Sequence, residues 1–284
     1  MPKVWRIVDL IQWSESYFRG KSHQNPRLEI EWMLCSLLNC ERLDLYMRFD
    51  EPLSGSQLST LRGWVKRRSK NEPLQYITES CEFYGIEFFV DKRVLIPRPE
   101  TERLIDEAIK SIKHVRSPNI FDIGTGSGCI SIALAKEIEN SNVIGIDKSI
   151  MSLQVAKKNS AELNVENVTF LEMDILNQYP KEKFDLVISN PPYVPKKEIP
   201  GLMKDVKDFE PEIALTDFDD GLTFYKRISK IIPYILKDDS SCILELGLGN
   251  HPEKVLSIFK ESGYSNMEIF EDYNGDKRVL SIKI

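Results

Sequence analysis

The sequence predicts an α/β protein with a mostly parallel sheet and an antiparallel last strand, preceded by a small helical bundle and a β-hairpin. From Pro118 onward, apolar strand-like runs alternate with helical patterns, which is typical of a parallel sheet covered by helices on both faces. Residues 4–70 instead show the helical spacing of apolar side chains. The chain closes with two strand-like runs around Asn274-Gly275, a dipeptide typical of a type I′ hairpin, so we expect the last strand to be antiparallel.

Length and composition limit the class of protein. A chain of 284 residues is long for one domain. Its residues are 42% hydrophobic and 29% charged, and this content of apolar side chains is enough to build a buried core. It contains no run of about 18 apolar residues that could span a membrane. The start, MPKVWRIVDLIQW, carries charge within its apolar stretch and lacks the cleavage site of a signal peptide. The five cysteines form no C-x-x-C pair, which fits thiols in a reducing compartment, so we expect a soluble cytoplasmic protein.

The charge is unevenly distributed along the chain. Residues 1–75 carry 12 Lys and Arg against 9 Asp and Glu, whereas the remainder carries 26 against 35. A protein that binds duplex DNA usually has a strongly basic domain or stripe. Only Arg62–Lys70 approaches one, and a solvated helix end is the better interpretation of that segment. We therefore expect no stable binding of nucleic acid.

The first predicted domain, residues 1–73, is a helical bundle. One face of its first helix is marked by Val4, Ile7, Val8 and Ile11. Asn25 followed by Pro26 is typical of a helix start. Ser54 with Gln57 fits a capping box before another helix. We expect the aromatic and leucine side chains of this domain to form its core.

Residues 74–97 are predicted to be a β-hairpin linker, because CEFYGIEFFVDKRVLI (81–96) alternates and is rich in aromatic and β-branched residues. Pro97 and Pro99 end the extended structure, and a helix is expected from Glu100 to about Val115 in a domain that covers residues 98–284. In that domain we expect strands at 119–124, 142–147, 167–174, 184–190 and 241–247, with helices ending near 137 and spanning 149–163, 222–236 and about 252–262.

A glycine-rich loop, Asp122-Ile-Gly124-Thr-Gly126-Ser-Gly128, follows the first of these strands. It differs from the dinucleotide fingerprint G-x-G-x-x-G, because a cysteine stands where the third glycine would fall, and the chain has no G-x-x-x-x-G-K-[ST] for a nucleoside triphosphate. Asp147 ends the second strand, where a carboxylate can accept both hydroxyls of a ribose, and Asp174 ends the third, where it can accept from an adenine amino group. Each aspartate alone is more often a cap, but the glycine-rich loop, Asp147 and Asp174 lie at three successive strand ends and together predict a site for a nucleoside without a pyrophosphate.

Asn190-Pro191-Pro192-Tyr193 follows the fourth strand. Alone it would be read as a proline-stiffened turn. Beside the predicted nucleoside site, however, the prolines remove two N–H donors and leave the Asn190 amide oxygen and the Pro191 carbonyl as convergent acceptors. Two acceptors that grip the hydrogens of a substrate –NH₂ would turn its lone pair toward an electrophile. Tyr193 offers a flat wall for a planar group.

These motifs resemble the class I S-adenosylmethionine-dependent methyltransferases, whose sheet is Rossmann-like and seven-stranded. Asn190–Tyr193 is similar to their amino-methylating members, which include DNA adenine methylases and protein glutamine methylases. Five runs along nearly the whole chain together resemble the peptide chain release factor glutamine methyltransferases (the PrmC/HemK family): Glu72-Pro-Leu-Gln-Tyr76, Glu82-Phe-Tyr-Gly85, Leu95-Ile-Pro-Arg-Pro-Glu-Thr-Glu102, Asn190–Tyr193, and Glu210-Pro211 with Ala214-Leu215 and Asp220-Gly221-Leu222. The chain departs from the pattern at Glu79 and Phe218, where glycine is expected.

The resemblance implies methyl transfer from S-adenosylmethionine, which leaves as S-adenosylhomocysteine, to the side-chain amide nitrogen (N5) of the glutamine in the Gly-Gly-Gln motif of release factors. Implied catalytic residues are Asn190, Pro191 and Tyr193, and the substrate-binding residues add Pro192. Implied cofactor residues are Asp122, Gly124, Thr125, Gly126, Ser127, Gly128, Asp147, Asp174, Ile175 and Asn190. The helical domain would recognise the release factor, and we expect a monomer that acts in translation termination.

Other residues carry weaker implications. By resemblance the Pro97–Glu102 loop, with Arg98 and Glu102, closes over the cofactor, but helix capping by Thr101 is an equal alternative. No histidine or cysteine is marked by the sequence as an obligatory base, no metal-ligand spacing is present, and His23, His114 and His251 are interpreted as surface or structural residues.

Two other functions remain open from the sequence. One is a nucleic-acid adenine-N6 methyltransferase that uses the same four residues on an exocyclic amine, which would need base flipping and a domain for duplex recognition. The small first domain and the acidic chain disfavour it. The other is a non-enzymatic sensor of S-adenosylmethionine, which would have no use for Asn190–Tyr193.

Overall fold

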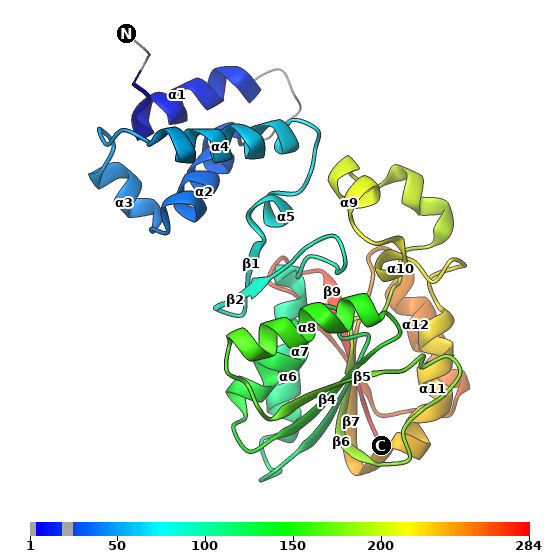
Figure 1. Cartoon of the computed structure of the whole chain (residues 1–284). Coiled ribbons are helices and arrows are strands. Elements are labelled where there is room, and N and C mark those ends of the chain that lie inside the picture. Colours follow the sequence, from blue (N-terminus) through cyan, green and yellow to red (C-terminus); the bar gives the residue numbers. More distant parts are fainter. Residues whose placement is uncertain (1–3, 19–24) are drawn as a thin grey trace. The chain divides into compact units, whose positions relative to one another are not determined.

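The computed structural model describes residues 4–18 and 25–284, and the chain divides into two compact units (Figure 1). One unit contains residues 1–79 together with α9 (Lys204–Phe209), and the other contains residues 80–203 and 210–284.

The N-terminal unit is a bundle of short helices. Its elements are α1 (Ile7–Phe18), α2 (Pro26–Leu38), α3 (Arg42–Met47), α4 (Gly55–Arg68) and α5 (Leu74–Thr78). The predicted capping box is confirmed, because Ser54 Oγ accepts from the Gln57 backbone N–H and Gln57 Oε1 accepts from that of Ser54. Pro26 begins α2 as predicted, but the Asn25 side chain makes no capping hydrogen bond. Ile7 and Ile11 are buried, whereas Val4 and Trp32 are exposed, so the core takes only part of the predicted apolar set.

The hairpin is shorter than the predicted linker. Leu74–Thr78 form α5, and the two strands are β1 (Ser80–Phe83) and β2 (Ile86–Phe89), which pair antiparallel within the second unit. Glu79 ends α5 with a φ of 57°, the left-handed conformation that glycine adopts most easily. This geometry explains why a glycine is expected there. The domain boundaries at 73 and 97 stay a prediction.

The second unit contains a seven-stranded sheet. Its strands are β3 (Asn119–Ile123), β4 (Asn142–Asp147), β5 (Val168–Glu172), β6 (Phe184–Ser189), β7 (Leu236–Glu245), β8 (Met267–Glu271) and β9 (Lys277–Lys283). Their order is β5-β4-β3-β6-β7-β9-β8, with β9 antiparallel to both of its neighbours and the five strands from β5 to β7 parallel. The predicted fold, a parallel sheet with an antiparallel last strand, is confirmed.

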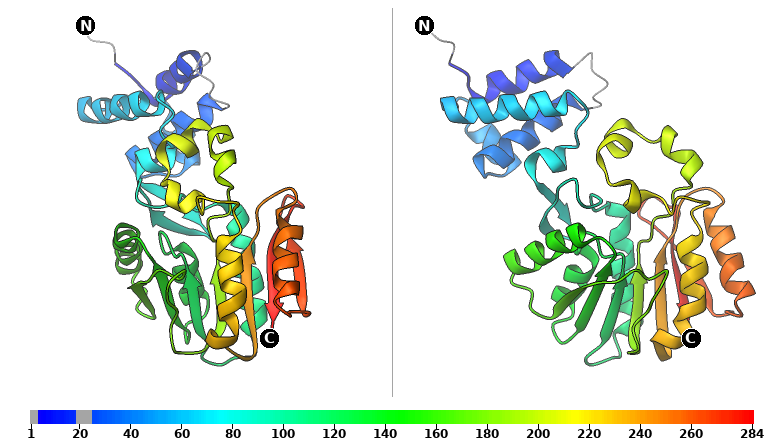
Figure 2. Two further views of the ribbon diagram at one scale, coloured as in Figure 1. Left: turned by 90° about the vertical axis from the view of Figure 1, so that its right-hand side faces the viewer. Right: turned by 45° about the vertical axis from the view of Figure 1, so that its right-hand side comes forward.

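Helices cover both faces of this sheet (Figure 2). On one face lie α6 (Glu102–Ile112), α7 (Cys129–Glu137) and α8 (Ile150–Glu162), and on the other α11 (Thr223–Ile235) and α12 (His251–Glu261). Shorter pieces are η1 (Pro99–Thr101), η2 (Lys196–Gly201) and α10 (Glu212–Leu215). Successive strand residues supply opposite cores: Ile120 packs with the first group of helices and Phe121 with the second. Among the residues described, no helix is both long and apolar enough to span a membrane.

The topology brings the predicted motifs together. The chain leaves β3 toward β4 and β5 on one side, and β6 and β7 lie on the other, so the strand order reverses beside β3. The loops that follow β3, β4 and β6 therefore meet at one edge, where open α/β sheets bind ligands. The glycine-rich segment and Asn190 lie in these loops, and Asp147 is the last residue of β4.

The last turn differs from the prediction. Strands β8 and β9 are separated by five residues, and Gly275 has a positive φ whereas Asn274 does not. A type I′ turn requires a positive φ at both central residues, so that prediction is wrong. The Asp272 carboxylate organises the loop instead, because its Oδ1 accepts from the backbone N–H groups of Asn274 and Asp276.

Candidate active site

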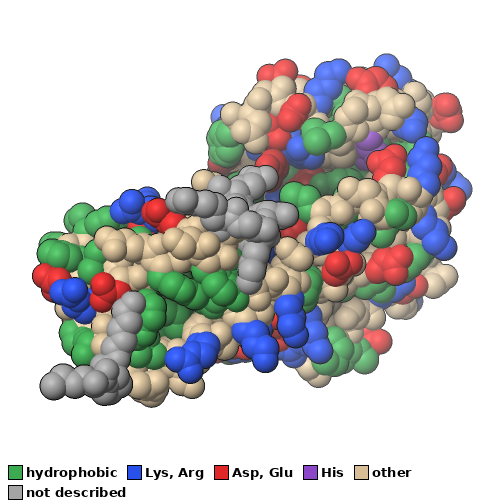
Figure 3. Space-filling view, turned by 90° about the horizontal axis from the view of Figure 1, so that it is seen from above, with side chains coloured by type: hydrophobic (Ala, Val, Ile, Leu, Met, Phe, Trp, Pro, Cys, Tyr) green, Lys and Arg blue, Asp and Glu red, His purple; other side chains and the backbone are tan. Residues whose placement is uncertain are grey.

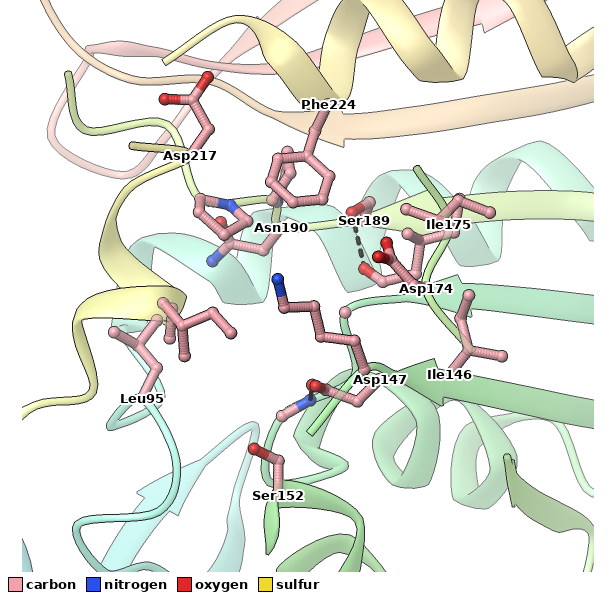
Figure 4. Close-up of a pocket in the computed structure, with 18 of the residues that line it drawn as sticks. Leu95, Ile146, Asp147, Ser152, Asp174, Ile175, Ser189, Asn190, Asp217 and Phe224 are labelled. Atoms are coloured by element: carbon pink, nitrogen blue, oxygen red, sulfur yellow. Dashed lines mark hydrogen bonds between the residues drawn. The ribbon is translucent and has the colours of Figure 1, made fainter. Parts of the chain in front are cut away.

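A pocket opens at the carboxyl ends of β3, β4 and β6, wholly within the second unit (Figure 4). Predicted site residues that line it are Gly124, Gly126, Asp147, Asp174, Ile175, Asn190, Pro191 and Pro192. Asn190 and Phe224 lie on one side, and Asp147 and Ser152 lie on the other. Its apolar walls include Leu95 and Ile146. Residues far apart in the sequence thus share one cavity.

Five other predicted residues do not line the pocket: Asp122, Thr125, Ser127, Gly128 and Tyr193. The first four build the glycine-rich loop from within. Asp122 is fully buried, and its Oδ2 accepts from Thr125 Oγ1 (2.7 Å) and Ser131 Oγ (2.6 Å). A Cβ on Gly145 would lie 2.7 Å from Ser131 Oγ and 2.8 Å from Thr125 Oγ1, so only glycine fits behind this cluster.

Asp122 retains one unused acceptor. Within the described part of the chain, its Oδ1 is buried and has no hydrogen-bond partner. Burial raises the pKa of Asp122 to about 6, although the Ser131 and Thr125 hydroxyls act in the opposite direction. A buried acceptor with no donor is costly, so this oxygen favours a site that receives a donor from elsewhere.

The backbone of the glycine-rich loop is already hydrogen-bonded. The N–H groups of Gly124 and Thr125 donate to the Ile146 carbonyl, at 2.9 and 2.8 Å, and that of Gly128 donates to the Thr125 carbonyl. The Gly126 N–H donates to Asp147 Oδ2 at 3.0 Å. A phosphate-binding loop needs such donors free, so this one suits a ligand without a phosphate.

Asp147 and Asp174 each combine two roles. Asp147 Oδ1 accepts from the Ser149 N–H, and Asp174 accepts from the Leu176 N–H and from Asn177 Nδ2. These are the capping contacts of the simpler interpretation, yet both side chains also line the pocket. A carboxylate has about four acceptor sites, so each retains capacity for a ligand. Burial raises the pKa of Asp147, opposed by its backbone hydrogen bonds.

The Asn190 amide is held from one side. Its Nδ2 donates to Thr101 Oγ1 at 3.1 Å, and Thr101 Oγ1 donates to Glu245 Oε2 at 2.6 Å. Over the residues that the structure describes, no donor reaches Asn190 Oδ1. Thr101 makes no capping bond at the start of α6, so the capping alternative is wrong. The amide oxygen remains available as an acceptor at the pocket edge.

Tyr193 anchors the loop rather than facing the pocket. Its hydroxyl donates to Glu245 Oε1 at 3.1 Å, and its ring lies 5.8 Å from that of His251. A Cβ on Gly221 would come within 2.2 Å of the Tyr193 carbonyl oxygen, and Gly221 has a φ of 80°, so glycine is required there. His251 Nδ1 accepts from the Gly247 N–H, and burial lowers its pKa, which makes it a neutral structural residue.

Arg98 and Glu102 are engaged in structural contacts. Arg98 pairs with the buried Glu210, whose other oxygen accepts from the Ile96 N–H, and Glu102 accepts from the Tyr84 N–H at 2.9 Å. Neither lines the pocket. His114 is exposed, His23 lies outside the described residues, and nowhere in 4–18 and 25–284 do three possible metal-ligating side chains cluster.

Sequence reasoning missed two residues of the site. Asn159 is buried on α8, where its Oδ1 accepts from the Phe89 N–H and its Nδ2 donates to the carbonyls of Phe89 and Ser127, which ties the hairpin to the glycine-rich loop. Glu245, at the end of β7, holds both Thr101 and Tyr193. The sequence signal that could have predicted a role for Glu245 is an acidic residue at the end of an otherwise apolar strand, as in SCILELG.

Comparison with known proteins agrees with this fold. Residues 115–263 match the methyltransferase domain family, and residues 9–78 match the PrmC N-terminal domain family. The fold is similar to that of a human methyltransferase 10 domain containing protein (TM-score 0.52, 18% identity, 70% of this chain and 90% of that one). It is also similar to the Thermus thermophilus 16S rRNA N2 G1207 methyltransferase in complex with AdoMet and guanosine (TM-score 0.51, 15% identity, 72% and 49%). Fold and site define a class I, S-adenosylmethionine-dependent methyltransferase.

Relatives narrow the class to a family. The chain is 38% identical over 283 residues to a release factor glutamine methyltransferase of Geobacter sulfurreducens. The aligned region covers 100% of this chain and 98% of the relative. It is 35% identical over 280 residues to one of Bacillus cereus, with 97% and 98% covered. The chain belongs to the release factor glutamine methyltransferase family.

Proposed function

We propose that the protein methylates the side-chain amide nitrogen (N5) of the glutamine in the Gly-Gly-Gln motif of peptide chain release factors. The observation that carries the proposal is the Asn190 amide oxygen, which has no donor among the described residues and belongs to a pocket wall opposite Asp147. The names of the relatives support the choice of glutamine and release factor.

The pocket fits S-adenosylmethionine as methyl donor. Asp147 would accept from the ribose hydroxyls, and Asp174 and Ile175 would border the adenine. A Cβ on Gly124 would meet no protein atom within 4 Å, so a ligand can approach the backbone there. Three carboxylates (Asp147, Asp174 and Asp217) and one lysine line the pocket, a balance that favours a cationic ligand over an anionic one.

The chemistry requires alignment more than proton transfer. When bound, S-adenosylmethionine supplies a methyl group on a positively charged sulfur. Asn190 Oδ1 and the Pro191 carbonyl would accept hydrogen bonds from the two N–H groups of the substrate amide. These bonds would orient the lone pair of the amide nitrogen and increase the electron density on that nitrogen. The proton lost after transfer would pass to solvent. We assign Tyr193 to holding the loop, because its hydroxyl and ring already have protein partners.

The N-terminal unit would recognise the protein substrate. An apolar groove on it is lined by Trp5, Leu10, Trp13, Tyr17, Leu58, Leu61 and Val65, with Arg62 and Lys66 at its edge. Figure 3 shows hydrophobic side chains gathered on this unit beside Lys and Arg. Such a surface suits an apolar segment with acidic flanks. A cytoplasmic location, a monomeric state and no stable binding of nucleic acid belong to the same proposal.

Mass spectrometry tests the proposed function. The protein is incubated with labelled S-adenosylmethionine and either a bacterial release factor, the same factor with the motif glutamine changed to alanine, or unmethylated DNA. We expect one added methyl group on the motif glutamine and none on the variant factor. Label on DNA alone would establish the adenine-N6 alternative. Cofactor binding without label on any acceptor would establish the sensor.

A further inference from the structure

A buried carboxylate behind the pocket has no role in the proposed chemistry itself. Glu245 is 1% exposed, and both of its oxygens are hydrogen-bonded to residues of the Asn190 region. We propose that Thr101 and Glu245 are positioning residues that fix which way the Asn190 amide faces. This inference rests on the proposed function and adds to it residues beyond the four of the motif.

The direction of the hydrogen bonds determines the orientation. A threonine hydroxyl has one hydrogen to donate, and Thr101 gives it to Glu245 Oε2 at 2.6 Å. Thr101 Oγ1 can then only accept from Asn190. Of the two ends of that amide, only Nδ2 can donate, so Nδ2 lies 3.1 Å from Thr101 and Oδ1 is directed elsewhere.

This orientation decides whether the motif can work. A substrate amide presents N–H donors, which require an acceptor. If the Asn190 amide were turned over, its NH₂ would face those N–H groups and donor would oppose donor. The Thr101–Glu245 pair therefore determines that Oδ1, and not Nδ2, of Asn190 faces the substrate amide. Asn190 alone cannot determine this, because either end of its amide can form hydrogen bonds.

Glu245 also secures the other end of the motif. Its Oε1 accepts from Tyr193 at 3.1 Å, and its backbone carbonyl accepts from the Tyr225 hydroxyl at 2.6 Å. A protonated Glu245 could still accept from Thr101 at Oε2 while it donates from Oε1 to Tyr193. The charged side chains that act on it are Arg278 and Glu100. One carboxyl group thus positions both Asn190 and Tyr193.

Burial alone does not explain this carboxyl group. Burying a carboxyl group costs desolvation free energy, so a contribution to stability is a weak reason for its presence. A role that depends on its acceptor oxygens accounts for both contacts.

The test compares Thr101→Val, which keeps the shape and loses the hydroxyl, with Thr101→Ser, which keeps the hydroxyl. Loss of one orienting hydrogen bond should lower kcat about tenfold in Thr101→Val, whereas Thr101→Ser stays within about threefold of the wild type. Affinity for S-adenosylhomocysteine should change less than about twofold in both, because Thr101 does not line the pocket. In an Asn190→Ala background, the added Thr101→Val change should have almost no effect, since its target is gone.

A tenfold loss that persists in the Asn190→Ala background would overturn the inference, as would equal activity of the valine and serine variants. A second readout does not depend on activity. The side-chain amide signal of Asn190, assigned by its loss in Asn190→Ala, should exchange hydrogen slowly in the wild type and Thr101→Ser and faster in Thr101→Val. If the wild type does not methylate release factors, the proposed function fails, and this exchange pattern still decides the positioning role.

Discussion

The amide of Asn190 is the group on which the proposed chemistry depends most directly. We expect Asn190→Ala to lower kcat/KM for the release factor by about 100- to 1,000-fold, the loss typical of one group that stabilises a transition state. The Asn190 side chain donates to Thr101, which does not line the pocket, so affinity for S-adenosylhomocysteine should change little. Steady-state kinetics and calorimetric titration measure the two quantities.

Asn142→Ala serves as the control, because Asn142 is an exposed asparagine at the start of β4 and lies outside the pocket. It should leave both quantities near the wild-type values. An equal loss of cofactor affinity and of kcat/KM in Asn190→Ala would contradict the assigned role.

Single residues were predictable where their role depends on strand ends. Asp147 ends β4 and Asn190 follows β6, the two strands that flank β3, and parallel topology brings such ends to one edge of the sheet, so both residues could be predicted to lie in the pocket. Glu245 and Thr101 lie 144 positions apart, and no local pattern links them. The position of Tyr193 depends on Gly221 and His251, so its orientation away from the pocket required the structure.

At the level of elements, the basic segment at the end of α4 contains some side chains that form ion pairs and others that do not. Arg67 pairs with Glu72, and Arg68 pairs with Glu29, both within the N-terminal unit. Arg62 and Lys66 are exposed and make no ion pair with any described residue. Both also border the apolar groove. Lys70, two residues beyond α4, is exposed as well. Within the fully described segment Arg62–Lys70, the basic side chains available to a partner are therefore these three.

Reversal of Arg62, Lys66 and Lys70 to Glu should raise KM for the release factor with little change in kcat, because the contact would act equally in ground and transition states. A tenfold increase at low salt that shrinks at high salt is the expected size and behaviour for exposed charges. Kinetics with the intact release factor at two salt concentrations measure it.

The control reverses Lys230, Lys254 and Lys260, three exposed lysines on α11 and α12, which gives the same change in net charge. KM should then stay near the wild-type value. An unchanged KM in the α4 variant would remove α4 from substrate recognition.

Elements were predicted best where periodicity and core packing agree. The strands β3, β4 and β6 are rich in buried apolar side chains, and all four strands from β3 to β6 have ends within two residues of the predicted ranges. The turn at Asn274-Gly275 failed, because Asp272 satisfies the backbone of a longer loop and removes the need for two left-handed residues. Phe218, predicted to stand in place of glycine, does have a φ of 65°, in a loop held by the Asp217 carboxylate.

At the level of the whole molecule, two buried carboxyl groups couple folding to pH. Burial raises the pKa of Glu245 from 4.5 to about 7, although hydrogen bonds from Thr101 and Tyr193 and the charge of Arg278 oppose the shift. Asp122 shifts in the same direction, from 3.8 to about 6. A raised folded-state pKa means that the folded state prefers the protonated form. The stability gained is complete below the unfolded pKa and is lost as pH rises through the folded pKa.

Glu245→Gln isolates one of these groups, since an amide of the same shape does not titrate. Between pH 5 and 8 the wild type should lose on the order of 2–3 kcal/mol of unfolding free energy relative to Glu245→Gln, with most of the loss between pH 5 and 7. Urea denaturation at intervals of half a pH unit measures the difference, and the Asp122 contribution cancels because both proteins retain it. Glu253→Gln, a change at an exposed glutamate on α12 that pairs with Lys277, should leave the wild-type pH dependence over this range intact, because the Lys277 hydrogen bond lowers the pKa of Glu253. Parallel curves of unfolding free energy against pH for the wild type and Glu245→Gln would contradict this prediction. They would mean that Glu245 ionises as readily in the folded protein as in the unfolded chain, because the surroundings of its carboxyl group are more polar than its hydrogen bonds indicate.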